Sequence, residues 1–466
     1  MVVILPASPK ELAMTLPRRM LLNAFSMSCI SHIHHGLWSR SDTRQLDYAS
    51  FAPWTELAQL LERGCFDSIF LADVIGTHDV FRDGADTSVV EAMQIPINDP
   101  AMLIPAMAQV TEHLGLAYTS SVLQIPPFTF ARQISTLDHL TQGRVGWNIV
   151  TSALRNAGTN LGFPGLPSHE ERYNRADEYL DVVYKLWEGS WEDDAVLRDV
   201  VRGRYADPAK VHAINHTGDY YKVEGPHLCE PSPQRTPLLF QAGSSTRGRT
   251  FAAQHAECVF VVDSLAALNG PASVVRDIQT QARAFGRNPD EIRFFQGLSP
   301  VVGGTEADAK AKLDDYMESY SMDGALAHIS GTMGVDLDGV DLEAPIESIE
   351  VEALRGWVKG LIDANPKKTQ TFRDLIRTRT LERFIVGAPE QVADGMEAWF
   401  NAGIDGFNLT YSVTPGTFCD FIDGVVPILQ KRGLAQTEYA PGTFREKLFG
   451  HANVSKDHHA ASYRRD

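Results

Sequence analysis

Two similar stretches indicate the fold of the chain: Ile69-Phe-Leu-Ala-Asp-Val-Ile75 and Arg144-Val-Gly-Trp-Asn-Ile-Val-Thr-Ser152. Each is a short apolar run that ends abruptly in polar residues, with Asp73 in the first and Asn148 in the second. Such runs are typical of strands in a parallel sheet that is covered on both faces. Polar groups at the carboxyl ends of these strands lie where α/β proteins bind ligands. A helix N-cap or a salt bridge is the alternative role for Asp73.

Segments of the same kind recur along the chain in alternation with helical patterns. Strands are expected at 19–26, 68–73, 114–121, 145–150, 237–243, 258–262, 292–302 and 405–410. Helices are expected at 54–65, from about 98, and at 127–140, 175–187, 249–255, 272–285, 389–400 and 418–430. This alternation predicts an α/β fold, a (β/α)8 TIM barrel with insertions at the C-terminal face of the strands. An open doubly wound sheet is the alternative, but it would usually show a G-x-G-x-x-G turn, which the sequence lacks.

The alternation also predicts how the chain is divided. We expect a leader over residues 1–18, one barrel domain over 19–450 and a C-terminal tail over 451–466. Two excursions interrupt the regular pattern, at about 191–237 and 304–380. The second is helix-rich and acidic in its middle, and we expect it to pack at the barrel mouth.

Composition excludes several classes of protein. The 466 residues include 42 basic and 59 acidic side chains, a formal net charge of −17 that disfavours a nucleic-acid or anionic-membrane partner. No apolar run is long enough to span a bilayer, and Met1-Val-Val-Ile-Leu-Pro6 lacks the charged start of a secretory signal. Five scattered cysteines without a C-x-x-C pair indicate reduced thiols and a cytoplasmic protein.

The predicted strand ends carry mostly neutral hydrogen-bonding groups among aromatic residues. They hold Phe25, Ser26, Asp73, Thr119, Asn148, Thr151, Ser152, Gly243, Ser244, Ser245 and Asn408. No carboxylate pair for glycoside hydrolysis and no lysine for a Schiff base is evident there, and G-x-S-x-G, H-E-x-x-H and P-loop motifs are absent. Such a site is suited to a polar aromatic cofactor that brings its own reactivity.

Five longer motifs carry a specific resemblance. They are Glu62-Arg-Gly-Cys-Phe-Asp-Ser-Ile-Phe-Leu-Ala-Asp73, Thr136-Leu-Asp-His-Leu-Thr-Gln-Gly-Arg-Val-Gly-Trp-Asn148, His169-Glu-Glu-Arg-Tyr173, Pro231-Ser-Pro-Gln-Arg-Thr-Pro-Leu-Leu-Phe-Gln-Ala-Gly-Ser244 and Asp405-Gly-Phe-Asn-Leu409. The chain resembles the bacterial-luciferase-like flavin monooxygenases, in the subgroup of nitrilotriacetate, dibenzothiophene-sulfone and dimethyl-sulfide monooxygenases. Leu186-Trp-Glu-Gly-Ser-Trp-Glu-Asp-Asp194 and Cys229-Glu-Pro-Ser-Pro-Gln-Arg235 are most similar to the dimethyl-sulfide branch.

The resemblance implies a two-component, FMNH2-dependent monooxygenase. Such an enzyme inserts one oxygen atom from O2 into a small organic substrate through a flavin hydroperoxide. A separate NAD(P)H:FMN reductase would supply the FMNH2, and the chain itself shows no dinucleotide fingerprint. The resemblance also implies a homo-oligomer, either a dimer or a tetramer.

The substrate stays open at this stage. Few basic residues stand at the predicted strand ends, which favours a small neutral organosulfur compound. An aminopolycarboxylate chelate or a halogenated aromatic is the alternative substrate. A deazaflavin-dependent oxidoreductase on the same fold, or a flavin-binding protein without turnover, is the alternative function.

The resemblance also assigns roles to residues. The cofactor-binding set is Asp73, Thr119, Asn148, His169, Tyr173, Ser244 and Ser245, and His32 borders the substrate side of the flavin as the catalytic candidate. Asp73 and Thr119 would lie at the isoalloxazine and ribityl region, and His169, Tyr173 and Ser244 at the phosphate end. A turn over 243–245 that opens a helix offers backbone N–H groups to a phosphate, which suits this assignment. Arg172 would add charge there or form a surface salt bridge.

Two groups of residues have competing interpretations. The trio His32, His34 and His35 has no carboxylate or cysteine at ligand spacing, which disfavours a metal site, so we expect no metal and a surface-loop role for His34 and His35. Aromatic residues in the predicted strands, Phe25, Phe70 and Trp147, would wall the flavin or fill the core.

Overall fold

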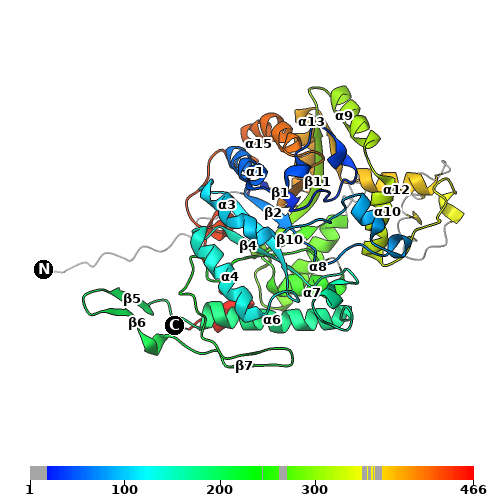
Figure 1. The fold of residues 1–466 in the computed structure, drawn as a ribbon. Helices are drawn as coiled ribbons and strands as arrows, with labels where there is room; N and C mark the ends of the chain where they lie inside the picture. Colours follow the sequence, from blue (N-terminus) through cyan, green and yellow to red (C-terminus); the bar gives the residue numbers. More distant parts are fainter. Residues whose placement is uncertain are drawn as a thin grey trace.

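The computed structural model describes residues 18–465 except 244, 262–269, 349–353, 355–357, 360–361 and 363–369. Its centre is a closed barrel of parallel strands surrounded by helices (Figure 1). The barrel strands are β1 (Leu21–Met27), β2 (Ser68–Ala72), β3 (Gly115–Ser121), β4 (Val145–Val150), β9 (Leu238–Gln241), β10 (Cys258–Val261), β11 (Arg293–Val302) and β13 (Gly406–Thr410). They pair in that order, and β13 pairs with β1 to close the ring. The predicted TIM barrel is therefore confirmed, with each predicted strand in its place.

One strand beside the barrel was missing from the sequence expectation. β12 (Phe384–Gly387) pairs in parallel with the second half of β11, at Ser299 to Val302. It is only four residues long and directly follows a helix, so its apolar run was too short to separate from a helical pattern. This strand connects the end of the second excursion to the carboxyl-terminal half of β11.

Helices cover the outside of the barrel. They are α1 (Phe51–Arg63), α2 (Asp86–Val90), α3 (Ile104–Gln109), α4 (Pro127–Leu140), α5 (Ala157–Asn160), α6 (His169–Gly189), α7 (Thr246–His255), α8 (Gly270–Ala284), α9 (Glu306–Glu318), α10 (Met322–Met333), α12 (Phe372–Leu381), α13 (Pro389–Asn401), α14 (Gly416–Asp420), α15 (Val426–Lys431) and α16 (Phe444–Phe449). α6 begins six residues earlier than expected, at His169, because the Ser168 hydroxyl caps the backbone N–H of Glu171 at 3.2 Å. The motif from His169 to Tyr173 is therefore the first turn of a helix and not a loop.

The side chains of each barrel strand alternate between two cores. Inside the barrel, Phe25, Phe70, Phe240 and Phe295 are buried against one another. Between strands and helices, Trp147 packs against Phe130 of α4, and its Nε1 donates to the Ser120 carbonyl at 3.0 Å. This alternation is the period-two pattern of a sheet with both faces buried.

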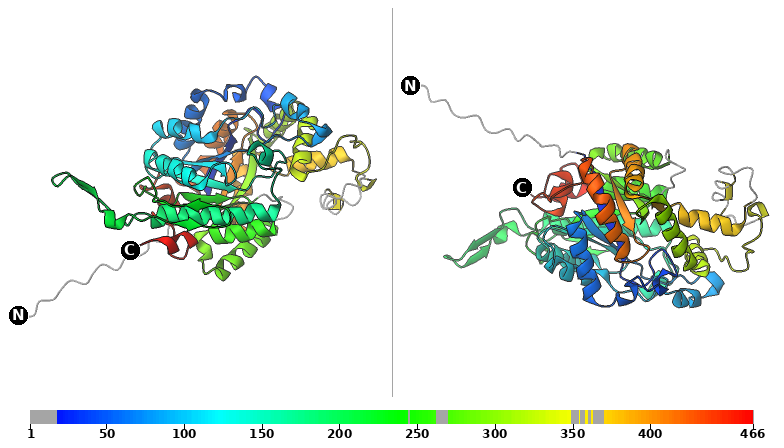
Figure 2. Two further views of the ribbon diagram at one scale, coloured as in Figure 1. Left: turned by 60° about the horizontal axis from the view of Figure 1, so that its bottom comes forward. Right: turned by 90° about the horizontal axis from the view of Figure 1, so that it is seen from above.

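The two excursions lie on different sides of the molecule (Figure 2). In the first, β5 (Val196–Asp199) and β6 (Arg204–Ala206) form an arm that projects from the body, and β7 (His216–Thr217) pairs with β8 (Lys222–Val223). In the second, α9, α10 and α12 lie beside the barrel, and α10 and α12 share a small core around Leu326, Phe372 and Ile376. Insertions of this kind leave the barrel itself intact.

The C-terminal segment is packed against the body. A short helix, η11 (His459–Tyr463), lies along α6, and the Tyr463 hydroxyl donates to Asp181 at 2.8 Å. Arg464 forms an ion pair with the fully buried Glu188 at 2.6 Å. In the part of the chain that the structure describes, no helix has the length and apolarity needed to cross a membrane.

Candidate active site

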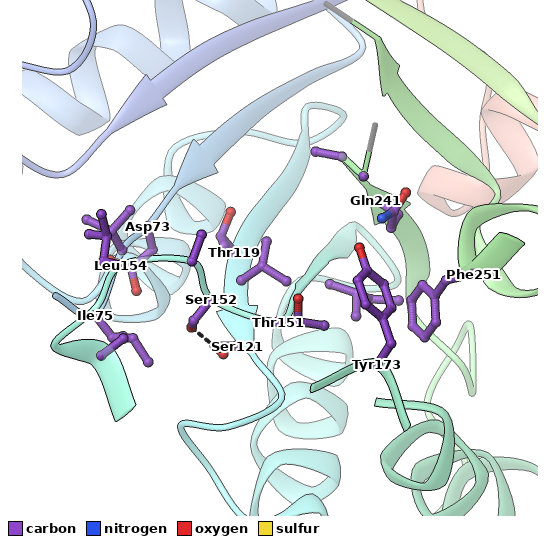
Figure 3. Close-up of a pocket in the computed structure, with 17 residues that line it drawn as sticks. Asp73, Ile75, Thr119, Ser121, Thr151, Ser152, Leu154, Tyr173, Gln241 and Phe251 are labelled. Atoms are coloured by element: carbon purple, nitrogen blue, oxygen red, sulfur yellow. Dashed lines mark hydrogen bonds between the residues drawn. The ribbon is translucent and has the colours of Figure 1, made fainter. Parts of the chain in front are cut away.

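A cavity of about 250 Å³ opens at the carboxyl ends of β2, β3, β4 and β9, between the barrel and the start of α6 (Figure 3). We call it the flavin cavity. Its polar walls are Asp73, Thr119, Ser121, Thr151, Ser152, Tyr173 and Gln241, and its apolar walls include Ile75, Leu154 and Phe251. Ligands of α/β barrels bind at this end of the strands.

Asp73 is the acidic group of the flavin cavity. The residue follows β2 directly, and the next helical turn begins only at Phe81, so the alternative role as an N-cap is wrong. Among the described residues, no basic side chain forms an ion pair with it. Burial raises the pKa of Asp73 to about 7, and the nearby charge of Asp99 adds to the shift. A carboxyl group poised near neutral pH in a cavity is characteristic of a functional site.

Neutral hydrogen-bonding groups continue from β3 to β9. The Asn148 side-chain amide donates to Thr119 Oγ1 at 2.8 Å, and the Ser121 and Ser152 hydroxyls lie 2.8 Å apart. The side-chain carbonyl oxygens of Asn148 and Gln241 are buried without a hydrogen-bond partner among the described residues. Buried polar atoms are normally paired, so these two oxygens indicate that a ligand with N–H or O–H donors belongs here.

The far end of the flavin cavity is built for close backbone approach. A Cβ atom added at Gly243 would lie 3.0 Å from the Tyr173 hydroxyl oxygen, and one added at Gly248 would lie 2.8 Å from it. α7 starts next to this point, and its N-cap Ser245 accepts from the Gly248 backbone N–H at 3.0 Å and lies 3.2 Å from His169 Nε2. A helix N-terminus with adjacent hydroxyl groups is an anion site.

The structure thus brings most of the predicted phosphate residues together. His169, Tyr173 and Ser245 come from two helices that meet at the cavity. Burial raises the pKa of Tyr173, so its hydroxyl remains a hydrogen-bond donor at neutral pH. The predicted residue Ser244 lies outside the described residues. Arg172 forms no ion pair within the described part of the chain, and its Nη1 donates to the Pro167 carbonyl at 2.6 Å.

The expectation for the histidine trio is partly wrong. His34 and His35 are not surface residues: they are 5% and 1% exposed. The loop after β1 turns inward, where His34 Nε2 lies 2.9 Å from Ser299 Oγ and His35 Nε2 lies 2.9 Å from His328 Nδ1. The sequence pattern of a loop did not reveal that α10 covers it. Among the described residues, no group of three or more His, Cys, Asp or Glu side chains is placed to hold a metal ion.

His32, the catalytic candidate, does not line the flavin cavity. Its ring packs edge-on against Phe25 at a centroid distance of 4.7 Å and faces Tyr411 at 6.3 Å. Burial lowers the pKa of His32 to about 3, so the ring is neutral at physiological pH. Its Nδ1 has no hydrogen-bond partner among the described residues. The residue can therefore donate or accept a hydrogen bond, but it does not gain a charge near neutral pH.

Sequence reasoning missed three residues that complete this region. His78 Nε2 lies 3.1 Å from Gln94 Oε1, and Gln94 in turn donates to the His32 carbonyl at 2.9 Å. The rings of His78 and His328 are 5.0 Å apart. Gln94 and His78 stand in an irregular loop and His328 in an insertion, so no periodic signal linked them to β1.

Of the three aromatic residues, Phe25 and Phe70 belong to the barrel interior and Trp147 does not. Phe25 and Phe70 contact each other at 5.4 Å and lie beneath the barrel mouth. Trp147 points into the outer core, so core packing is its role. None of the three lines the flavin cavity.

Comparison with known proteins agrees with this geometry. The family pattern of luciferase-like monooxygenases matches residues 27–406. The chain belongs to this family. It is 50% identical over 454 residues to the long-chain alkane monooxygenase of Geobacillus thermodenitrificans, covering 96% of this chain and 98% of the relative. It is 46% identical over 453 residues to the dimethyl-sulfide monooxygenase of Hyphomicrobium sulfonivorans, covering 96% and 94%.

A solved structure shows the same likeness. The crystal structure of a riboflavin lyase with modified FMN and riboflavin superposes with a TM-score of 0.87 at 36% identity, covering 96% of this chain and 100% of that chain. This luciferase-like chain is therefore a flavin-dependent oxidoreductase of the monooxygenase class. The side-chain oxygens of Asn148 and Gln241, which have no partner among the described residues, fit a flavin ring that offers N–H groups, and the start of α7 fits a phosphate at the end of the flavin chain.

Proposed function

We propose that this chain is the oxygenase of a two-component system, in which reduced FMN and O2 oxygenate a small organic substrate. The observation that carries the proposal is the flavin cavity. Among the described residues, its wall holds the Asp73 carboxyl group without an ion-pair partner and the Gln241 amide oxygen without a hydrogen-bond partner, and a helix begins at its far end. Reduced FMN, when bound, supplies the reaction with dioxygen, and the protein supplies position and shielding from water.

The residues of the cavity divide this work. Asp73, Thr119, Asn148 and Gln241 would hold the polar ring and the ribityl chain. Tyr173 and His169, with Ser245 at the start of α7, would hold the phosphate through hydroxyl, imidazole and backbone donors. His32 would border the substrate as a neutral hydrogen-bonding group, and Phe25 and Phe70 beneath it help to exclude water from the barrel.

The test of this site is a titration of the chain with FMN, followed by quenching of flavin fluorescence. We expect Asp73→Ala and Tyr173→Phe each to weaken binding by roughly ten- to a hundredfold, the value of a hydrogen bond to a charged group. Tyr205→Phe, on the projecting arm, serves as the control and should bind FMN like the parent. Unchanged affinity in both site variants would show that the cavity is not the flavin site.

For the substrate we propose a small organosulfur compound, because the dimethyl-sulfide relative covers nearly the whole chain and the flavin cavity has no basic side chain in its wall. A long-chain alkane is the second candidate, favoured by the 50% identity to the alkane relative. Incubation with a supplied reductase, O2 labelled with ¹⁸O and each substrate separates the two. One labelled oxygen atom in the product formed from a thioether supports the first candidate. Label only in the alcohol formed from the alkane supports the second.

We also propose that a separate reductase delivers the FMNH2. Outside the barrel, the described residues of the two excursions hold short hairpins, helices and the single strand β12, without the repeated βαβ unit of a nicotinamide domain. Under anaerobic conditions, NADH and FMN should leave the flavin oxidised in the presence of this chain until a reductase is added. Rapid bleaching without a reductase would contradict the proposal.

Finally, we propose that the chain forms a homo-oligomer in the cytoplasm. The projecting arm exposes Val200 and Val201 by 92% and 97% at its tip, and exposed apolar groups of this kind often mark contact surfaces. The five cysteines are all free, as expected in a reducing compartment. Light scattering coupled to size exclusion measures the assembly, and a monomer at micromolar concentration would contradict it.

A further inference from the structure

A second cavity, of about 270 Å³, lies between the loop after β1 and the helices of the second excursion. We call it the arginine cavity. Its walls come from His34 and His35 on one side, from Tyr320 and His328 around α10, and from Arg379 and Arg383 near the end of α12. It shares no wall residue with the flavin cavity, but His34 and His35 belong to the same loop as His32.

The charges around the arginine cavity do not cancel. Arg379 is paired with Glu382 at 2.7 Å, and both line the cavity. Arg383 also lines it, and among the described residues no carboxylate lies within ion-pairing distance of its guanidinium group. Burial lowers the pKa of Arg383, because removing its charged group from water costs free energy. Among the residues that the structure describes here, one positive charge therefore remains without a partner.

The surrounding imidazoles do not supply a counter-charge. Burial lowers the pKa of His34 and of His35 to about 3 each, and it also lowers that of His328, so all three are neutral. His34 is 5% exposed, and its Nδ1 has no hydrogen-bond partner among the described residues. The hydroxyls of Tyr320 and Thr380 lie 2.9 Å apart. Since that contact uses only one of their two protons, the other is available to a ligand.

We propose that the arginine cavity binds the carboxylate of a small organic acid. The planar guanidinium of Arg383 would donate one N–H hydrogen bond to each carboxylate oxygen, as arginine does at bidentate sites. His34 and the Tyr320–Thr380 hydroxyl pair would supply neutral contacts. His34 and His35 belong to the same loop as His32, the residue proposed to border the substrate, so the acid would be the polar end of the substrate itself; that role rests on the proposed function, whereas the binding does not.

The test compares two probes that differ in one group. 3-(Methylthio)propionate carries a carboxylate, and 3-(methylthio)propan-1-ol carries a hydroxymethyl group in its place. Calorimetry with the full chain measures each affinity without turnover. We expect the acid to bind at least about tenfold more tightly than the alcohol, and Arg383→Gln to remove this preference.

Three further measurements keep the result unambiguous. Arg377→Gln, at an exposed position of α12, six residues before Arg383, should keep the preference for the acid. Arg383→Lys should keep part of it, because the charge remains and the fork is lost. Unchanged FMN affinity in each variant confirms an intact fold. A preference that survives Arg383→Gln, or a parent chain that binds neither probe at millimolar concentration, would overturn the proposal.

The oxygenase reaction is scored separately. If the acid binds through Arg383 but neither probe is oxygenated with reductase and FMN, the substrate class is wrong and the anion site stands. If both probes are oxygenated with equal KM in the parent and in Arg383→Gln, the oxygenase function stands and the arginine cavity does not hold the polar end of the substrate; calorimetry alone decides whether the cavity binds the acid.

Discussion

The flavin cavity and the arginine cavity differ in what builds them and in the charge they hold. The first is built from the ends of four barrel strands and holds Asp73, which has no ion-pair partner among the described residues. The second is built from an insertion folded over the β1 loop and holds Arg383, which also has no ion-pair partner in the described part of the chain. We propose from this contrast that the barrel positions the cofactor and that the insertion selects the substrate.

The largest effect is expected from a substitution that disturbs the flavin cavity and leaves the arginine cavity unchanged. In Gly243→Ala, the new methyl group would lie 2.2 Å from Gln241 Nε2 and 3.0 Å from the Tyr173 hydroxyl oxygen. The Gln241 side chain, the Tyr173 ring or the start of α7 must shift to make room, which displaces the walls proposed to hold FMN. FMN affinity should therefore fall, by up to roughly a hundredfold if the whole overpacking cost of about 1–3 kcal/mol is felt in the bound state. Fluorescence titration measures it.

Gly165→Ala is the matched control, because a Cβ added there meets nothing within 4 Å. It should bind FMN normally. Acid binding at the arginine cavity should be unchanged in both variants. Equal FMN affinity in Gly243→Ala and the parent would mean that the close approach at Gly243 is not used by the cofactor.

The next effect is expected from a substitution in the second excursion, where α10 packs against the histidines. A Cβ added at Gly331 on α10 would lie 2.2 Å from His78 Nδ1. Gly331→Ala should therefore push α10 off the histidines and lower the free energy of unfolding by about 1–3 kcal/mol. Urea denaturation measures the loss. Thr332→Ala, exposed in the same turn, should change stability by less than about 0.5 kcal/mol, and similar losses in both would argue against this contact.

These two cavities also show what the sequence could predict. The walls of the flavin cavity follow periodic apolar strands, so Asp73, Thr119 and the start of α7 were placed by pattern and by resemblance. The arginine cavity joins His34 to α10 and to Arg383, which lies 383 − 34 = 349 positions further along the chain, and no local pattern encodes such a contact. The burial of His34 and His35 was missed for the same reason, since only the packing of an insertion shows that their loop turns inward.

A smaller effect concerns the pH dependence of stability. The folded-state pKa of Asp73 is raised from 3.8 to about 7, so the native protein binds more protons than the unfolded chain between those values. Stability should then fall as the pH rises through this window and level off above it. Because the side chain is partly exposed, we expect a contribution on the order of 1–2 kcal/mol.

Asp73→Asn tests this sign without changing the size of the side chain. Relative to the parent, the apo variant should become more stable as the pH is raised from about 4 to about 8, in urea unfolding at each pH. The difference between the two proteins removes the titration of all other groups. Parallel curves for the parent and the variant would show that Asp73 titrates normally.

The smallest effect tests how much the hydrogen bond of the neutral His34 contributes to the free energy of unfolding. His34 Nε2 lies 2.9 Å from Ser299 Oγ, and its ring packs on Phe384 at 4.6 Å. Ser299→Ala leaves both ring nitrogens without a partner among the described residues, so it should cost about 1 kcal/mol of unfolding free energy. His34→Phe together with Ser299→Ala removes both polar partners and keeps the ring contact, so the pair should cost less than Ser299→Ala alone. If the double variant is the less stable one, His34 contributes more than this hydrogen bond to the fold, and the imidazole itself is needed at the arginine cavity.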